Sequence, residues 1–472
     1  MEDELQLKIP IPLQPLAPKL GSASSEETMR HEPSLASLAA PEEKRPELSS
    51  QSATELVPQD VEPPGVAAVP SPPPNGGIIA WLHVVGGFML FFNTWGILNA
   101  FGAFQTYYES GALFHKSSSD ISWIGSIQSF MVLVTGVFAG PIYDRGYLRA
   151  LMIVGSFMIM FGHMMLSISS EYWQVLLAQG FCAGIGAGCL FVPCVSVLPT
   201  YFSTKIGLAV GIAASGSSFG GVIYPIVLHR LIDQIGFPWA VRSMGFIALG
   251  TLLIPICVMK MRLKSPKPRA LVDWTAFTDW PYMVFTIATL IGFIGLNIVF
   301  FYLSYFSLDK RVLDEDMSFY VIAIFNTASI FGRIAPNAIS DKIGLFNVLT
   351  PGALLTGVLL LIMMAVENEA AIIILAVLIG FFSGVFIAMP PVCMVALTEN
   401  KSLIGTRIGQ GYAMIAFGVL AGGPGAGAIL GTVEPLDWIG LWSFSGVTAC
   451  VASLIYAALR VVKYGPSLKI KV

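Results

Sequence analysis

Charged residues are scarce in this chain. Asp, Glu, Lys and Arg make up 12% of its 472 residues, whereas a soluble protein carries roughly 25%. Hydrophobic residues instead reach 55%. A helix of about 20 mostly apolar residues crosses the bilayer core of about 30 Å, and the chain after residue 77 holds twelve such stretches. The composition excludes an ordinary soluble protein and predicts an all-α, multi-pass membrane protein.

The sequence also lacks the short motifs that carry chemistry. It has no H-E-x-x-H zinc-protease motif and no Walker phosphate loop. The six cysteines all lie in apolar stretches without ligand spacing, so neither zinc nor disulfides are expected. We therefore expect no enzyme, no catalytic residue, no metal, no cofactor and no nucleic-acid partner. Without an ATP-binding motif, any transport is expected to be secondary.

A proline-rich segment precedes the apolar stretches. Residues 1–77 hold 14 of the 30 prolines and almost no aromatic residues. Such a segment buries too little apolar surface to offset its ordering entropy. The predicted organisation is a disordered cytosolic tail at 1–77, a six-helix bundle at 78–260, a cytosolic linker at 261–280, a second six-helix bundle at 281–464 and a cytosolic tail at 465–472.

The predicted spans divide six and six around the linker. Their ranges are 79–104, 121–141, 150–168, 173–198, 206–228, 239–260, 281–306, 317–340, 346–366, 370–397, 407–430 and 438–460. An even number places both termini on one side. If that side is cytosolic, its loops and the C-terminal tail hold fifteen Lys and Arg against four in the opposite loops, as expected of cytosolic loops. We predict cytosolic termini in the plasma membrane, with the vacuolar membrane as the alternative.

One arginine stands deep inside the eighth predicted span. Arg333 precedes Asp341 by eight residues, about 12 Å along a helix. An arginine at membrane depth costs about 2.5–3.5 kcal/mol on insertion scales, and the predicted spans contain no Asp or Glu to pair with it. Polar residues at helical spacing share its face, namely Asn326, Ser329, Asn337 and Ser340.

This polar stripe predicts the lining of an aqueous path. Within it, Arg333 is expected to bind an anionic substrate, because a guanidinium can hold a carboxylate through two parallel hydrogen bonds. The other expected substrate-binding residues are Asn326, Ser329 and Asn337. The alternative is a structural arginine bonded to backbone carbonyls.

The two predicted halves share small repeats. The fourth span carries Gly180, Gly184 and Gly188, and the tenth carries Gly380, Gly384 and Ala388. Small residues four apart let helix backbones approach closely. The fifth and eleventh spans contain glycine-rich runs at 207–221 and 418–431. These repeats predict a duplicated six-helix unit; the glycine runs indicate tight packing, or bendable helices that let the halves rock.

Charged loops follow the second and eighth spans at matching positions. Asp144-Arg145 aligns with Asp341-Lys342 at an offset of 197 residues. We predict that these residues and Arg149 form a gate, with Asp144 near a helix N-terminus and Arg145 or Arg149 as its ionic partner. The alternative is that both arginines only set the topology.

Several of these segments resemble a known family. "DRGYLR" after the second span resembles the signature loop of the major facilitator superfamily. "YFSTKIGLAVGIAASGSSFGG" resembles the fifth-helix motif of its monocarboxylate porter family, and "PPNGGIIAW" resembles the first-helix motif with Asn75 in place of an acid. "FGRIAPNAISDKIG" resembles the eighth-helix arginine segment of fungal members. The resemblance covers about residues 72–464 and implies two six-helix bundles, alternating access and transport of small organic acids, often with a proton.

Two departures from that family leave proton coupling open. Animal members carry an aspartate one turn before the arginine, where Ser329 stands here. They also carry a first-helix lysine, whereas this span has only His83 at its entrance. The candidate proton-coupling groups are His83 and His163, each of which is otherwise a hydrogen-bonded packing residue. Facilitated diffusion is the alternative.

Bulky aromatic residues stand on the expected cavity helices. They are Phe92, Trp95, Phe101, Phe104, Phe300, Tyr302 and Tyr305. If they line the cavity, the site suits an amphipathic acid larger than lactate; otherwise they pack in the core or against lipid. We predict a monomeric secondary transporter for a small organic anion, either a monocarboxylate-like solute or an acidic secondary metabolite, in an unassigned direction. The alternatives are a non-transporting nutrient sensor on the same fold and an uptake carrier for a vitamin or another neutral small molecule.

Overall fold

The computed structural model describes residues 73–262, 268–433 and 435–466. These residues form helices joined by loops and turns, so the predicted all-α class is confirmed. Most of the predicted tails at 1–77 and 465–472 lies outside the described residues, as does part of the predicted linker.

Each predicted span of the first half overlaps a helix or a run of short helices. Their bounds are Ile78–Asn93 (α1), Trp95–Asn99 (α2), Phe101–Glu109 (α3), Ser118–Asp144 (α4), Leu148–Leu166 (α5), Tyr172–Val175 (α6), Gly184–Ser196 (α7), Leu198–Tyr201 (α8) and Ile206–Val258 (α9), with a π-helix at Leu176–Ala183 between α6 and α7.

The second half follows the same pattern. Its helices are Trp280–Asp309 (α10), Glu315–Ile343 (α11), Leu345–Ile362 (α12), Glu369–Ala388 (α13), Pro390–Leu397 (α14), Ile404–Leu430 (α15) and Trp438–Tyr464 (α16). Short 3-10 turns stand at Trp274–Phe277 in the linker, at Met363–Ala365 and at Lys401–Leu403.

The described residues contain eleven helical stretches long and apolar enough to cross a membrane. One of them, α9, has 53 residues, which corresponds to about 80 Å and far exceeds the bilayer core of about 30 Å. Gly236 interrupts it with a φ of 74°, a left-handed conformation that glycine adopts readily. Helix α9 therefore supplies the fifth and sixth spans, and the prediction of twelve is confirmed.

The first span is broken at Thr94 and at Ala100. Close backbone approaches occur at the short pieces: a Cβ on Gly96 would lie 2.8 Å from the Cα of Gly220 in α9. A Cβ on Gly102 would clash with the carbonyl oxygen of Phe300 in α10. Helix α2 therefore packs within the first half, and α3 reaches the second half.

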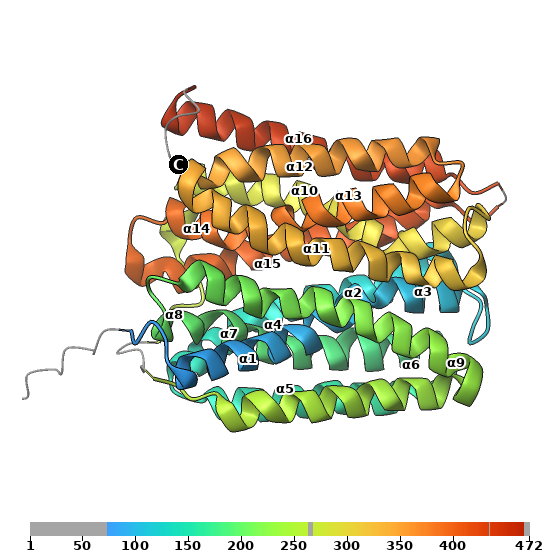
Figure 1. Ribbon diagram of the computed structural model, residues 1–472, viewed down its shortest axis with the longest axis horizontal. Coiled ribbons are helices and arrows are strands. Elements are labelled where there is room, and N and C mark those ends of the chain that lie inside the picture. Colours follow the sequence, from blue (N-terminus) through green and yellow to red (C-terminus); the bar gives the residue numbers. More distant parts are fainter. Residues whose placement is uncertain (1–72, 263–267, 434, 467–472) are drawn as a thin grey trace, which may run out of the picture. The chain divides into compact units, whose positions relative to one another are not determined.

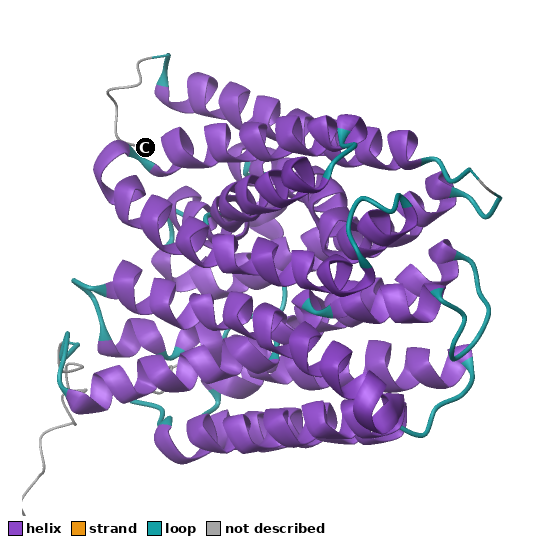
Figure 2. Ribbon diagram, turned by 45° about the vertical axis from the view of Figure 1, so that its right-hand side comes forward, coloured by secondary structure: helices purple, strands orange, loops and turns teal. Residues whose placement is uncertain are grey.

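The two halves form two layers of helices. Helices α1 to α9 lie in the lower part of Figure 1 and α10 to α16 in the upper part, and the same division is visible after a turn of 45° in Figure 2. Between the layers, α4 packs along α15 and α9 packs along α11. We call these contacts the α4–α15 seam and the α9–α11 seam. The end where α1 begins and α16 ends is called the termini end.

The glycines of the fourth and tenth spans pack in matching ways. A Cβ on Gly184 would lie 2.9 Å from the carbonyl oxygen of Gln128 in α4. A Cβ on Gly384 would lie 2.7 Å from the carbonyl oxygen of Ser329 in α11. In both halves, therefore, the helix of the fourth span (α7 or α13) lies directly on the backbone of the helix of the second span (α4 or α11).

The glycine-rich fifth and eleventh spans repeat a second contact. Gly216 in α9 packs on the backbone of Phe88 in α1, and Gly418 in α15 packs on the backbone of Leu290 in α10. Because a side chain at either position would meet a backbone atom, the glycines are needed for this packing. The repeat seen in the sequence thus corresponds to repeated helix pairs.

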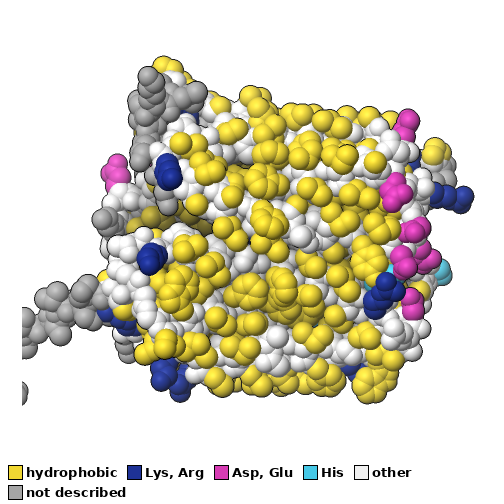
Figure 3. Space-filling view, in the orientation of Figure 1, with side chains coloured by type: hydrophobic (Ala, Val, Ile, Leu, Met, Phe, Trp, Pro, Cys, Tyr) yellow, Lys and Arg dark blue, Asp and Glu magenta, His cyan; other side chains and the backbone are white. Residues whose placement is uncertain are grey.

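Charge is sorted along the bundle. On the face shown in Figure 3, most Lys and Arg side chains lie at the termini end, most Asp and Glu side chains lie at the opposite end, and hydrophobic side chains cover the surface between them. A broad apolar band between two polar ends is expected of a surface that faces lipid.

Candidate functional site

Arg333 lies on α11, within the α9–α11 seam. Its side chain is buried, with the residue 4% exposed. Its Nη1 donates a hydrogen bond to the hydroxyl of Ser217 on α9, and its Nε donates to the hydroxyl of Ser329 at 3.3 Å. The arginine therefore bridges the two halves through neutral hydroxyl groups.

No ion pair among the described residues includes Arg333. Those present join His229 to Asp316, Arg269 to Asp144, and Arg407 to both Asp273 and Asp279. A buried guanidinium without a carboxylate keeps an uncompensated charge, and the low local dielectric strengthens its attraction for an anion. Chemically, the site fits a carboxylate, which a guanidinium can bind through two parallel hydrogen bonds.

The predicted polar stripe faces α9 at its centre. Asn326 is fully buried, and its Nδ2 donates to the carbonyl oxygen of Gly221 at 3.3 Å. The Oδ1 of Asn326 has no hydrogen-bond partner. Asn337 is half-buried and donates to the carbonyl oxygen of Arg333 at 2.6 Å. The stripe therefore holds a second polar group, Asn326, that can accept a hydrogen bond on the same seam.

The packing loosens between Arg333 and the termini end. Gly211 on α9 is buried, yet a Cβ added there meets no atom within 4 Å. It precedes Ser217 by six residues, about 9 Å along the helix toward the termini end. Figure 3 shows the surface hollowed between the halves at that end. The site is therefore closed at Arg333, with open space beside α9 on its termini side.

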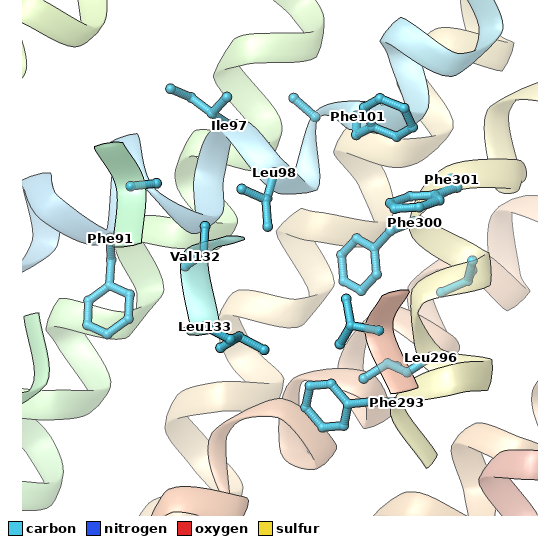
Figure 4. Close-up of a cluster of buried hydrophobic side chains, with 14 of the residues drawn as sticks. Phe91, Ile97, Leu98, Phe101, Val132, Leu133, Phe293, Leu296, Phe300 and Phe301 are labelled. Atoms are coloured by element: carbon cyan, nitrogen blue, oxygen red, sulfur yellow. The ribbon is translucent and has the colours of Figure 1, made fainter. Parts of the chain in front are cut away.

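An apolar surface lies between the halves. In Figure 4, Leu98, Leu133, Phe293 and Phe300 point from α2, α4 and α10 toward a common central region. All four side chains are buried. Apolar groups contributed by both halves can contact the body of an amphipathic solute whose charged end is bound elsewhere on the seam.

Aromatic rings also cross between the halves. The ring of Phe191 on α7 lies 5.8 Å from that of Trp95 and 5.7 Å from that of Tyr412 on α15. Of the aromatic residues predicted for a cavity, the buried ones are Phe92, Phe101, Phe104, Phe300 and Tyr302, and the half-buried ones are Trp95 and Tyr305. Most of the predicted set therefore packs between helices.

The predicted gate residue Asp144 ends α4 at the termini end. Its carboxylate accepts three hydrogen bonds from Arg269 of the linker, from the backbone N at 2.8 Å, Nε at 2.7 Å and Nη2 at 2.8 Å. Arg145 and Arg149, the partners expected from the sequence, are exposed. Asp144 is thus bound by a linker residue 125 positions away, rather than by its neighbours.

The linker also binds the second half. Arg407 on α15 donates to Asp273 at 2.9 Å and to Asp279 at 2.6 Å, and the backbone N of Asp273 donates to Gln410 at 3.0 Å. Burial raises the pKa of Asp273, but hydrogen bonds from Thr275 and Arg407 outweigh it and bring that pKa below its ordinary value. Asp273 is therefore charged at neutral pH.

The matching loop of the second half contributes less. Lys342 is exposed near the end of α11, and the side chain of Asp341 lies outside the described residues. The described ion pairs at the termini end are those of Asp144 and Arg407, and both of these residues bind the linker.

The two histidines predicted for proton coupling are bonded within the first half. Nδ1 of His83 lies 2.7 Å from the carbonyl oxygen of Ile79, and its Nε2 accepts from the backbone N of Lys260 at 3.0 Å. Nδ1 of His163 lies 2.8 Å from the carbonyl oxygen of Ile159. Both ring nitrogens of His83 therefore have backbone partners within the first half.

Helices of the two halves meet at the end opposite the termini. The hydroxyl of Tyr302 on α10 lies 3.2 Å from the carbonyl oxygen of Ser118 and 3.3 Å from that of Gly423. The hydroxyl of Ser119 donates to the carbonyl oxygen of Pro424 at 3.0 Å. These neutral contacts join the start of α4 to α10 and α15.

The expectation that no carboxylate falls on a span is wrong at this end. Helix α3 runs to Glu109, past the predicted boundary at 104. Glu109 is half-buried, and its carboxylate accepts a hydrogen bond from Gln105 at 2.7 Å. The helix is longer than hydropathy indicates because its last turn packs inside the protein, where polar side chains find partners.

The sequence analysis missed several residues of these contacts, among them Ser217, Arg269 and Tyr412. Ser217 lies in a glycine-rich run that indicates packing, and Arg269 enters only the count of basic residues. Tyr412 follows Arg407 and Gln410 in the eleventh span, and the spacing does not show which of them faces the other half. No sequence signal singles out Ser217, because Ser215, Ser218 and Tyr224 of the same span also carry hydroxyl groups.

Together these features define a multi-pass membrane transporter, built from two matched halves with a polar site on a seam between them. A family model described as Major Facilitator Superfamily matches residues 84–350. The chain belongs to the major facilitator superfamily, as the signature loop predicted.

Curated relatives agree with this assignment. The MFS-type transporter dbaD of Emericella nidulans is 64% identical over 381 residues, which cover 81% of this chain and 86% of that protein. The aspyridones efflux protein apdF of the same organism is 35% identical over 401 residues, covering 84% of this chain and 82% of that protein.

The fold also matches a solved structure. The crystal structure of peptide transporter POT in complex with sulfate superposes with a TM-score of 0.66, covering 84% of this chain and 98% of that one. At 12% identity, this likeness concerns the fold alone.

Proposed function

We propose that this protein exports an acidic, amphipathic secondary metabolite from a fungal cell. The observation that carries the proposal is Arg333, a buried guanidinium on the seam whose hydrogen-bond partners are the neutral hydroxyls of Ser217 and Ser329. Efflux is supported by the relative named as an aspyridones efflux protein.

Binding starts at the guanidinium. A carboxylate at Arg333 replaces the hydroxyl of Ser217 as the acceptor and gains two parallel, charge-assisted hydrogen bonds. The exchange is favourable because it compensates a buried charge. It also removes the Arg333–Ser217 contact that ties α11 to α9, so that binding of the anion and movement of the halves are coupled.

The apolar body of the solute fills the region between the halves. The side chains drawn together in Figure 4, among them Leu98, Leu133 and Phe300, supply an apolar surface. Burying an additional methylene group contributes about 0.8 kcal/mol, so this surface favours a large amphipathic acid over lactate.

The proposed orientation places the termini end in the cytosol, most simply at the plasma membrane. It is supported by the Lys and Arg side chains gathered at that end in Figure 3. The open space beside Gly211 then admits the solute from the cytosol, and α4, α10 and α15 close the outer end until the halves rock.

We also propose membership of the monocarboxylate porter family within the superfamily. The support is the eighth-helix segment around Arg333 together with the glycine-rich run that contains Ser217. Because Ser329 replaces an aspartate at the position one turn earlier, no neighbouring carboxylate competes with the substrate for the guanidinium. The protein is proposed to work as a monomer.

Arg333→Gln tests the proposal. Acidic metabolites are quantified inside and outside cells that carry the wild type, Arg333→Gln or Arg333→Lys. The glutamine variant is expected to lose at least about tenfold in export, the factor that corresponds to 1.4 kcal/mol. Lysine restores only part of it, because an ammonium cannot make the bidentate contact.

Arg242→Gln is the matched control. Arg242 also lies on α9 and donates to a hydroxyl, that of Ser167, at 3.0 Å. It stands after the kink at Gly236, in the part of α9 that forms the sixth span, and not in the part that forms the α9–α11 seam. Its variant is expected to export normally. Unchanged export by Arg333→Gln, at equal protein level and melting temperature, rules out the anion site. If the wild type binds the metabolite but does not transport it, the result supports a nutrient sensor. If the wild type transports neutral solutes alone, the result supports an uptake carrier.

A further inference from the structure

A histidine and a carboxylate join the two halves at the end opposite the termini. Nε2 of His229, on α9, lies 2.7 Å from Oδ1 of Asp316, on α11. The side chain of His229 is 9% exposed, whereas that of Asp316 is 59% exposed. The histidine is thus held inside the seam while its acidic partner keeps contact with solvent.

The imidazole ring is held in one orientation by aromatic neighbours. It stacks on Phe319 with ring centroids 4.3 Å apart and meets the edge of Tyr320 at 5.8 Å. Both rings belong to α11. The packing therefore directs Nε2 toward Asp316 and aligns this contact with the other contacts of the α9–α11 seam.

The pair belongs to the same seam as the proposed anion site. From the opposite end inward, α9 and α11 are joined by His229–Asp316, by Asn326 to the backbone of Gly221, and by Arg333–Ser217. Of these three cross-seam contacts, His229–Asp316 is the one that joins two titratable groups. Its strength is therefore the one that pH can change.

We propose that His229 is the proton-binding group of this transporter and that its protonation holds the opposite end closed. The proposal rests on the alternating access of the proposed function. It places the proton site on the seam between the halves, where a change in charge acts on their separation, instead of at His83 or His163, which are bonded inside the first half.

The sign of the effect follows from the contact. A neutral ring can donate one hydrogen bond from Nε2 to the carboxylate. A protonated ring donates the same bond and adds a Coulomb attraction to Asp316. Histidine side chains change charge between pH 5 and 8, so the added attraction is present at the acidic side of this range and is lost as the pH rises.

Other charged groups lie near the pair and modify this attraction. Arg230 follows His229 on α9, and its guanidinium lies over the ring of Tyr320 at 5.4 Å. Asp233 is exposed one turn further along α9, and Asp314 and Glu315 stand at the start of α11. The carboxylate of Asp314 caps the backbone N of Met317. The pair therefore stands on helices that also carry these three carboxylates and one guanidinium.

Hydrogen exchange of the purified full-length protein tests the proposal without any substrate. Backbone amides at 224–235 and 313–322 are followed at pH 5.5 and 7.5, after correction for intrinsic exchange rates. In the wild type, opening of these segments is expected to be about two- to fivefold less frequent at pH 5.5, the range for a partly exposed ion pair. Termini-end segments provide the internal reference.

Three variants complete the test. His229→Gln cannot titrate, and Asp316→Asn keeps an acceptor without its charge, so both are expected to remove the pH difference. Asp233→Asn removes an exposed carboxylate from the same helix and is expected to keep it. Loss of the pH difference in Asp233→Asn alone, its persistence in both seam variants, or its absence in the wild type would overturn the proposal.

The outcome is independent of the anion site. Arg333→Gln is expected to keep the pH difference at the opposite end even though it loses export. If His229→Gln exports normally at every pH while the wild type depends on pH, then His229 acts on the gate and the anion site stands. If the wild type shows no pH difference but Arg333→Gln still abolishes export, only the proton site is wrong.

Discussion

At the termini end, charged side chains join the halves through the linker, whereas at the opposite end the halves meet mainly through hydroxyl groups, glycines and backbone carbonyls. Arg269 binds Asp144 of α4, while Arg407 of α15 binds Asp273 and Asp279. Across the molecule, Tyr302 and its neighbours make neutral contacts. The exception at that end is the His229–Asp316 pair.

The difference concerns how each end can open. An ion pair on a linker can break and re-form without repacking of helices, and salt and pH affect it. Neutral contacts between closely packed helices depend on shape, because a displaced backbone loses many small attractions together. The termini end is therefore expected to respond to charge substitutions, and the opposite end to changes in side-chain volume.

The largest effect is expected from Gly427→Val at the opposite end. A Cβ at this position would lie 2.5 Å from the backbone N of Ser119 and 2.6 Å from the hydroxyl of Tyr302. Valine adds further atoms where backbone leaves no room, so closure of this end should cost about 3 kcal/mol, at the upper end of the usual range for overpacking. Export and hydrogen exchange at 118–124 report the loss.

Gly211→Val is the matched control at the other end. A Cβ there meets no atom within 4 Å, so exchange at 118–124 and protein stability should stay as in the wild type. Equal damage from the two substitutions would contradict the contrast between a tightly packed opposite end and open space beside α9.

A smaller effect is expected from Asp144→Asn at the termini end. The variant loses the charge that accepts three hydrogen bonds from Arg269. The attachment of the linker to α4 should therefore weaken by about 2 kcal/mol. Exchange of amides at 268–279 should rise, and the state open at the termini end should gain population. Arg269→Gln should have the same effect as Asp144→Asn, and the double variant should be destabilised little more than either single variant.

Arg145→Gln is the control for the Asp144–Arg269 contact. Arg145 follows Asp144 directly, but its side chain is exposed. Exchange at 268–279 should not change in this variant. A rise as large as that of Asp144→Asn would show that the loop arginine, and not the linker, holds Asp144.

The smallest effect is expected from Tyr302→Phe. The change removes one hydroxyl, which lies 3.2 Å from the carbonyl oxygen of Ser118 and 3.3 Å from that of Gly423, and leaves the ring in place. The loss should be about 1 kcal/mol and should appear as faster exchange at 118–124 without change at 268–279. A larger loss than for Gly427→Val would mean that hydrogen bonding, and not shape, closes this end.

Much of the fold could be predicted because hydropathy and helix length are local properties. The apolar stretches matched helices throughout, and Gly236 with Pro238 separated two spans within α9. Arg333 could be placed at depth from its distance to the end of the span. Its partner Ser217 could not be predicted, since a serine in a glycine-rich helix gives the same signal whether it faces the seam between the halves or a helix of its own half.

The linker shows the same limit. Arg269 stands among several basic residues at 260–269, and composition alone does not select the one that reaches Asp144. The choice depends on where the linker crosses the end of α4, which is set by the attachment of Asp273 and Asp279 to Arg407 on α15. Glu109 likewise falls on a helix because packing extends α3 beyond its apolar residues.

By itself, the sequence determined the membrane-crossing helices, their number and order, the duplicated glycine pattern and the depth of one arginine, because each depends on residues close together in the chain. Only the tertiary structure decided the pairs Arg333–Ser217, Asp144–Arg269 and His229–Asp316. Their members lie 116, 125 and 87 residues apart, and many other polar residues could have met in their place. The packing of whole helices across the seams selects among them, since a buried polar group is stable only where its partner is brought to it.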